Sequence, residues 1–376
     1  MIDCIEDESA FLALREEWEA LRLRSDSPSL FLSHDWIRCC WEELRSSKSM
    51  RVFVLRNGDG PVLIAPCMLS RVSDGSLPAT LLTFIEHPES QIAGMLMVEE
   101  SAGAEALDDL LQYMMSERGS EWDLLLLDKI PSESQTATVI RDALHETGRC
   151  YESGASHESL VIPLNSSWPE YLAHQSPRFR KTLRNIVNRM QKLGRLDLKT
   201  YHGKHGTAEA MGKLFSVSDA SWKVADDIAI TSSDKRMRFF KELAAGKVTS
   251  EGFRIIILEV DGMPIASETQ IIDGEIVFAL RSDYDERYAD SSPGSFLQME
   301  ILKELFSSSY REYNFGVGLN PYKTRWTEER RQLMRYRLYN DTIYGRILNT
   351  VDRCQPTLAR IPGVRLLNSV LARKSS

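Results

Sequence analysis

Residues 285 to 305 read DERYADSSPGSFLQMEILKEL. The polar turn Ser-Ser-Pro-Gly-Ser follows a strand-like segment and leads directly into a helix predicted over residues 293–309. The start of a helix offers backbone N–H groups without intrahelical acceptors, together with the positive end of the helix dipole. Gly294 leaves the backbone open to a ligand, and Ser291, Ser292 and Ser295 add hydroxyl groups. The turn is therefore a predicted phosphate or pyrophosphate site, although a simple helix cap by Ser292 explains the same residues.

The residues around this turn predict a mixed α/β unit. Three strands joined by DGMP and DG turns are predicted over residues 253–284, and YREYNFGVG is a strand after the helix. Upstream, SLVIPL is a predicted strand and residues 168–174 a short helix. A basic helix is predicted over 177–193, and further helices over 208–223 and 234–245. The sequence contains no GxxxxGK[ST] and no GxGxxG after a first strand, which excludes these two nucleotide-binding motifs.

The first half of the chain shows a similar order of elements. Helices are predicted over 8–21 and 34–44, followed by the hairpin MRVFVLRN/VLIAPCMLSR and the strands TLLTFI and AGMLMVEE. The strand WDLLLLDKI lies between helices predicted over 102–116 and 134–147. The expected fold class is therefore α/β with two similar halves, each a mixed, mostly antiparallel sheet flanked by helices.

This order of elements predicts three parts of the chain. They are a domain over 1–155, a catalytic domain over 156–335 and a basic extension over 336–376, with a hinge near residues 150–168. The first half has Glu99 and Glu100 where the second half has its Pro-Gly-Ser turn, and carboxylates there would repel a pyrophosphate. One cofactor site is therefore expected, in the second half.

Composition limits the class of protein. The 376 residues carry a net charge of −8 with a pI near 5.6, which fits a two-domain globular protein and does not favour nucleic acid as a partner. The N-terminus lacks the features of a signal peptide and no segment is apolar enough to span a membrane, so a cytoplasmic location is expected. Six scattered cysteines are expected to be reduced thiols. No metal site is expected, because His202 and His205 lack a third ligand nearby.

The C-terminal segment is basic. It carries apolar residues as well, so peripheral contact with an anionic membrane and docking onto the acidic body of the protein are both open. From residue 335 onward, the sequence contains eight basic residues and only two acidic ones, Asp341 and Asp352. The basic residues are Arg335, Arg337, Arg346, Arg353, Arg360, Arg365, Arg373 and Lys374.

Several short motifs resemble the GNAT acyltransferase superfamily, most closely its BioF-like or cellulose-biosynthesis (CelD) subgroup. These motifs occur in the expected order over most of the chain: FLSHDWIRCCWEEL, SPRFRKTLRNIVNRMQKLG, SWK at 221–223, VDGMPIASE, YDERYADSSPGSFL and GLNPYKTRW. The subgroup is related to the Fem aminoacyl transferases. The resemblance implies tandem GNAT-like domains and a pyrophosphate of acyl-CoA bound at Ser291, Ser292, Gly294 and Ser295. The turn departs from the usual Q/RxxGxG/A pattern, since it has one glycine.

Acyl transfer to an amine requires removal of the ammonium proton and protonation of the leaving thiolate. Glu268, on the strand IASETQII, is the candidate base, acting directly or through water. The resemblance places Tyr322 as the acid beside the thiol, and Asp283 or Tyr284 are candidates to orient the acceptor. Candidate substrate-binding residues are Lys323 and Arg325 beside Tyr322, Arg180 on the basic helix, and Trp222 in SWK.

The predicted function is an acyl-CoA-dependent N-acyltransferase, using acetyl-CoA or another acyl-CoA. Its acceptor is expected to be an amine, on an amino sugar or a cell-envelope or exopolysaccharide precursor. The first alternative is a Fem-type transferase that uses aminoacyl-tRNA, which the basic helix permits. The second is a non-catalytic tandem fold that acts as a scaffold for polysaccharide biosynthesis.

Overall fold

The computed structural model describes residues 1–25, 28–58, 60–72, 77–98, 101–146, 151–246 and 252–358. Among the sequence predictions, those on Glu99, Glu100 and Cys150 lie outside these residues, as do those on the basic residues from Arg360 onward. The side chains of His205 and Cys354 also lie outside the described part of the structure. The chain divides into unit 1, formed by residues 1–158 and 331–376, and unit 2, formed by residues 159–330.

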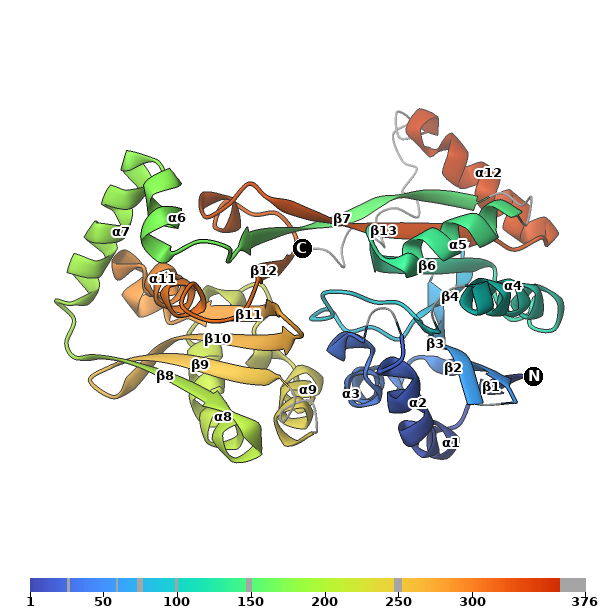
Figure 1. Cartoon of the computed structure of the whole chain (residues 1–376), viewed down its shortest axis with the longest axis horizontal. Coiled ribbons are helices and arrows are strands. Elements are labelled where there is room, and N and C mark those ends of the chain that lie inside the picture. Colours follow the sequence, from blue (N-terminus) through green and yellow to red (C-terminus); the bar gives the residue numbers. More distant parts are fainter. Residues whose placement is uncertain are drawn as a thin grey trace. The chain divides into compact units, whose positions relative to one another are not determined.

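Unit 1 is a mixed β-sheet whose strands are partly connected by helices (Figure 1). Its strands lie in the order β1-β2-β3-β4-β6-β13, with the first part of β7 beside β13 and β5 paired to β3. β4 and β6 are parallel and the helix between them is α4. The elements are β1 (Ile2–Ile5), α1 (Glu8–Ala13), α2 (Arg15–Arg22), α3 (His34–Leu44), β2 (Ser49–Asn57), β3 (Gly60–Val72), β4 (Ala79–Phe84), β5 (Leu96–Met97), α4 (Ser101–Ser116), β6 (Leu124–Pro131), α5 (Gln135–Glu146), β7 (Tyr151–Pro163), β13 (Arg330–Tyr339) and α12 (Ile343–Leu358).

Unit 2 repeats this plan (Figure 1). The second part of β7 begins a sheet in the order β7-β12-β11-β10-β9-β8, in which β11 and β12 are parallel and α11 connects them. The elements are α6 (Trp168–His174), α7 (Pro177–Met190), β8 (Leu196–His202), α8 (Gly203–Asp219), α9 (Asp234–Ala245), β9 (Phe253–Val260), β10 (Met263–Asp273), β11 (Ile276–Tyr284), α11 (Pro293–Leu305) and β12 (Glu312–Val317), with 3₁₀ turns η2 (Trp222–Val224), η4 (Glu286–Ser291) and η5 (Lys323–Arg325).

The two faces of the unit 2 sheet have different partners. Ile256 and Leu258 of β9 belong to the apolar core formed with α7 and α11, so the alternate residues Ile255 and Ile257 point to the face that α8 covers. The helix α7 buries Leu183, Ile186 and Met190 in the first core and exposes Arg178, Arg184 and Arg189, as an amphipathic helix does. Every side chain on β10 and β11 can therefore be assigned to the α11 face or to the α8 face.

Unit boundaries and some strands differ from the prediction. The beginning of the predicted basic extension belongs to unit 1, because β13 pairs with β6 and contributes Tyr336 and Leu338 to the core of that unit. The strand β13 was not predicted because its arginines resemble those of a solvent-exposed segment. In the structure Arg335 pairs with Asp128, and Arg337 lies 3.7 Å from Glu152. β1 and β8 were also missed. Cys39, Cys40 and Cys67 are buried thiols, and burial raises the pKa of Cys40 and Cys67.

Candidate functional site

The parallel strands β11 and β12 pair only over their first residues. The ladder joins residues 276–278 to residues 312–314 and then ends, although β11 continues to Tyr284 and β12 to Val317. The far end of β11 pairs with β10 but not with β12, and the helix α11 starts after the short turn η4 that follows it. The carboxyl ends of two neighbouring strands and the start of their connecting helix therefore meet, which is where open α/β sheets bind ligands.

The start of α11 offers fewer donors than the sequence suggests. Ser292 has a left-handed backbone (φ 59°) and makes no side-chain cap; its hydroxyl accepts a hydrogen bond from Arg189 at 3.1 Å, and its N–H donates to Ala289 O. Pro293 has no N–H, and the Phe296 N–H donates to Ser292 O. In the first turn of α11, the backbone N–H groups of Gly294 and Ser295 have no acceptor among the described residues.

Two tyrosines lie against Gly294. A Cβ added to this glycine would lie 3.4 Å from Cδ1 of Tyr284, so the ring of Tyr284 packs against the helix start. The hydroxyl of Tyr322 donates to Gly294 O at 3.2 Å. Burial, followed by the nearby charge of Glu268, raises the pKa of Tyr322, so this phenol stays protonated at neutral pH. The hydroxyl of Tyr322 is thus a hydrogen-bond donor held at the N-terminus of α11.

A cavity of about 780 Å³ lies beside this helix start. Such a volume suits a small ligand or the reactive part of a larger one. Ser295 and Arg325, both predicted, are among its lining residues, and so is Arg178, which lies on the same basic helix as Arg180. The rest of the lining is formed by His174, Gln175, Ser176, Phe179, Thr182, Leu183, Ile186, Thr324, Trp326, Thr327 and Glu328.

Glu268 is buried beneath this site. Its side chain is on the α11 face of the sheet, because it pairs with Ile256 of β9. Only 1% of the residue is exposed, and its carboxylate accepts from Ser282 Oγ at 2.8 Å, Tyr313 Oη at 2.9 Å and the Gln270 amide. Burial raises the pKa of Glu268 despite these donors. Direct contact with a substrate amine would require displacement of a neighbour.

Asp283 does not share this site. It pairs with Ser267, the neighbour of Glu268, so its side chain points to the opposite face of the sheet. There it contacts Lys223 Nζ at 2.5 Å and Arg281 Nε at 2.9 Å. Burial by itself would raise the pKa of Asp283, but the two positive charges outweigh it and lower the pKa. The geometry makes Asp283 part of a buried ion pair, and leaves Tyr284 as the residue of the two beside the helix start.

The predicted substrate-binding residues have different environments. Lys323 donates to three carbonyl oxygens, those of Gly316, Val317 and Gly318, and thereby holds the end of β12. The guanidinium of Arg325 lies 5.3 Å from the ring centre of Tyr322. Lys323, Arg180 and Trp222 are not among the residues that line the cavity. Arg180 donates to Ala173 O, and Trp222 is 42% exposed in the turn whose Lys223 pairs with Asp283.

Comparison with known proteins identifies the architecture. Residues 177–324, from the start of α7 to η5, match the family model described as "Acetyltransferase (GNAT) domain". No curated protein sequence matches the chain. L-PGS from Bacillus licheniformis superposes with a TM-score of 0.56 at 14% identity, covering 91% of this chain and 95% of that one. The chain has a tandem GNAT-like fold.

Two further solved structures have the same fold. FemX superposes with a TM-score of 0.55 at 11% identity, covering 92% of this chain and 98% of that one. The C-terminal domain of a putative lysylphosphatidylglycerol synthetase from Agrobacterium fabrum does so with a TM-score of 0.52 at 14% identity, covering 94% and 99%. None of these comparisons concerns the BioF-like or CelD subgroup, so that assignment stays a prediction.

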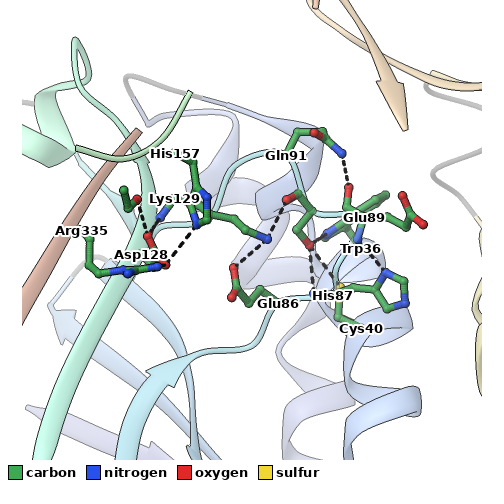
Figure 2. Close-up of polar contacts among 12 residues, drawn as sticks. Trp36, Cys40, Glu86, His87, Glu89, Gln91, Asp128, Lys129, His157 and Arg335 are labelled. Atoms are coloured by element: carbon green, nitrogen blue, oxygen red, sulfur yellow. Dashed lines mark hydrogen bonds and ion pairs between the residues drawn. The ribbon is translucent and has the colours of Figure 1, made fainter. Parts of the chain in front are cut away.

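In unit 1, the corresponding end of the sheet is held by ion pairs and hydrogen bonds among its own side chains. β4 and β6 pair in parallel as far as Thr83 and Leu126, and the segment after β4 then bonds to the end of β6. Figure 2 shows Lys129 reaching between Glu86, at 3.3 Å, and the carbonyl oxygen of Ser90, at 3.1 Å. Beside it, Asp128 contacts Arg335 and His157. These charges neutralise one another in place, whereas the end of unit 2 borders a cavity.

The described residues contain no group of three or more His, Cys, Asp or Glu side chains arranged to hold a metal ion. None of the helices searched in the described part of the chain is long and apolar enough to cross a membrane.

Proposed function

We propose that unit 2 transfers an acyl group from acyl-CoA to an amine. The observation that carries the proposal is the position of Tyr322, whose hydroxyl lies 3.2 Å from Gly294 O at the start of α11 and beside a cavity that Ser295 and Arg325 line. Support also comes from the GNAT domain match, which covers these residues. The free amides of Gly294 and Ser295 are the donors proposed for the pyrophosphate.

The proposed reaction involves two proton transfers, one to the leaving thiolate and one from the amine. The amine nitrogen attacks the thioester carbonyl carbon, the C–S bond breaks, and the sulfur leaves as a thiolate that takes the proton of Tyr322. The amine loses a proton, which passes to Glu268 through an intervening water because the carboxylate is buried.

The proposed roles of the arginines follow from their place on the cavity wall. Arg178 and Arg325 both line it, and a guanidinium suits the phosphates of the donor or a carboxylate of the acceptor. A small-molecule or glycan-precursor amine is the proposed acceptor. We place the reaction in the cytoplasm, because acyl-CoA is a cytoplasmic cosubstrate.

A second candidate is transfer of an aminoacyl group from tRNA. One observation favours it: Arg178, Lys181, Arg184 and Arg189 are all exposed on α7. Arg178 lines the cavity, and Arg189 donates to Ser292 at the start of α11. Such a row of cations would bind a phosphate backbone, and its affinity would fall steeply with salt. The cavity would then hold the aminoacylated end of the tRNA.

A binding screen decides between these donors. Thermal unfolding is followed with acetyl-CoA, longer acyl-CoAs and aminoacylated tRNA, because a ligand that binds the native state raises the unfolding midpoint. The donor that raises it is then supplied with a panel of amines that includes amino sugars, and release of free thiol or free tRNA is measured. Binding of acyl-CoA with turnover supports the proposal. A protein that binds neither donor supports the scaffold alternative.

A further inference from the structure

A buried chain of hydrogen-bonding groups joins Glu268 to Tyr322. Tyr313 is fully buried, and its hydroxyl lies 2.9 Å from Glu268 Oε1 and 3.1 Å from Gln298 Oε1. Gln298 is 1% exposed, and the same Oε1 lies 3.4 Å from the hydroxyl of Tyr322. Its Nε2 is buried without a hydrogen-bond partner among the described residues. A buried donor without an acceptor is costly, so this amide has a role beyond packing.

Counting hydrogens shows that the chain has two consistent arrangements. A tyrosine hydroxyl carries one hydrogen, so Tyr313 can donate to Glu268 or to Gln298 but not to both. When Glu268 is protonated, the carboxyl donates to Tyr313, and Tyr313 donates to the carbonyl oxygen of Gln298. This is the arrangement with the Gln298 nitrogen unpaired.

When Glu268 is ionised, Tyr313 must donate to it, because two oxygens without a hydrogen between them repel at 2.9 Å. The oxygen of Tyr313 then needs a donor from Gln298. The two ends of a carboxamide have nearly the same shape, so a half-turn of the amide places Nε2 where Oε1 was. The turned amide can donate to both Tyr313 and Tyr322, and its nitrogen is then paired.

We propose that Gln298 is a positioning residue whose amide orientation follows the protonation of Glu268 and thereby sets the hydrogen bonding of Tyr322. With Glu268 ionised, Gln298 donates to the oxygen of Tyr322, so the proton of Tyr322 is free for a leaving group. With Glu268 protonated, Tyr322 donates to Gln298 or to Gly294 O. The catalytic part of this inference rests on the proposed function, whereas the amide switch does not.

The surroundings allow Glu268 to change its protonation within an accessible pH range. Burial raises its pKa above the usual value of about 4.3 for glutamate. Asp283, Lys223 and Arg281 lie on the other face of the sheet. The other titratable or charged groups that bear on the chain are Arg254, which donates to Gln270 at 2.6 Å and lies 3.7 Å from Glu304, and Arg325 beside Tyr322.

The test observes the side-chain amide of Gln298 in the free protein. Protein labelled with ¹⁵N at glutamine is titrated from pH 4 to pH 8, and the NH₂ signals of Gln298 are identified by their loss in Gln298→Met. We expect these signals to shift with a midpoint above about 4.3, while those of the exposed Gln191 do not follow that midpoint. Glu268→Gln should abolish the shift. Tyr313→Phe should also abolish it, because the relay is broken although Glu268 still titrates.

Signals of Gln298 that do not move, or that shift equally in Tyr313→Phe, would overturn the inference, since the second result would mean a through-space effect of the charge. The activity arm is separate. Gln298→Met should lower kcat about 10-fold with an unchanged Kd for the acyl donor. An active enzyme whose Gln298 ignores pH refutes this inference alone. A protein without acyltransferase activity whose Gln298 switches refutes the proposed function alone.

Discussion

Glu268 and Asp283 lie on neighbouring strands of unit 2 but point to opposite faces of the sheet, because Glu268 pairs with Ser282 and Asp283 with Ser267. One carboxylate faces Tyr313 and the helix α11, and the other is held by Lys223 and Arg281. The two acids therefore have separate roles, and their substitutions should affect different measurements.

Asp283→Asn should lower the stability of the protein without changing its chemistry. Removing one partner of a buried ion pair costs about 3–5 kcal/mol. The lowered pKa of Asp283 means that its contribution is present above about pH 3.9 and is lost as the pH falls through the lower folded value. Urea denaturation at pH 7 and near pH 3 measures this. The double variant Asp283→Asn/Lys223→Met should lose less stability than the sum of the two single variants. A large fall in kcat would return Asp283 to the mechanism.

Tyr322→Phe should lower kcat by about 10²-fold or more while donor affinity stays near wild type. The phenol would no longer protonate the leaving thiolate, but the ring would still pack beside Arg325. Steady-state kinetics with a calorimetric titration of the donor separates the two quantities. Tyr310→Phe, on a tyrosine at the edge of the same core, is the matched control. An unchanged kcat would remove Tyr322 from the mechanism.

Gly294→Glu should abolish binding of acyl-CoA. Its carboxylate would block and repel a pyrophosphate at the amides of Gly294 and Ser295, while the fold loses about 1–2 kcal/mol at the helix start. Gly294→Ala is the control, because its Cβ would lie at ordinary contact distance, 3.4 Å, from Tyr284. Titration with acetyl-CoA and dephospho-CoA, with circular dichroism as a check of folding, gives the answer. Wild-type affinity in a folded Gly294→Glu protein would place the donor elsewhere.

Arg325→Gln and Arg178→Gln should each weaken donor binding about 10-fold, because a charge-assisted hydrogen bond to phosphate contributes about 1.5 kcal/mol. Both residues line the cavity, whereas Arg180, on the same helix as Arg178, does not. Arg180→Gln is therefore the control, and its affinity should stay within about twofold of wild type. Titrations at low and high salt measure the effect. Equal losses in all three variants would point to a general charge effect and not to a site.

The helix α12 is the proposed contact with an anionic membrane. Ile343 is 82% exposed and Ile347, one turn later, 45%, with Arg346 and Arg353 on the same helix. Each cation near an anionic surface contributes about 1 kcal/mol. The protein should sediment with phosphatidylglycerol vesicles, and Ile343→Ser/Ile347→Ser should reduce this several-fold. Equal sedimentation with phosphatidylcholine vesicles, or none with either, would contradict the proposal.

Local sequence patterns predicted most of the elements near the site. The helices α3 and α6 begin and end where the sequence places them, and α7 and α11 begin at the predicted prolines. Each of these depends on residues within a few positions of one another, such as the Ser and Pro before a helix or the apolar spacing along it. The strand β13 was missed because Arg335 and Arg337 resemble a solvated tail, and their partners Asp128 and Glu152 are distant in the sequence.

The sequence by itself therefore determined the tandem α/β plan and the glycine turn at the start of α11, and its resemblance to a known family singled out Tyr322. Tertiary structure alone decided which candidates share a site. The pairing of β10 with β11 contains an irregularity between Thr269 and Gln270, and strand register assigns each side chain to a face. That register separates Asp283 from Glu268. Gln298 and Tyr313 gained their roles only through contacts between α11, β10 and β12, because hydrogen-bond partners far apart in the sequence leave no local pattern.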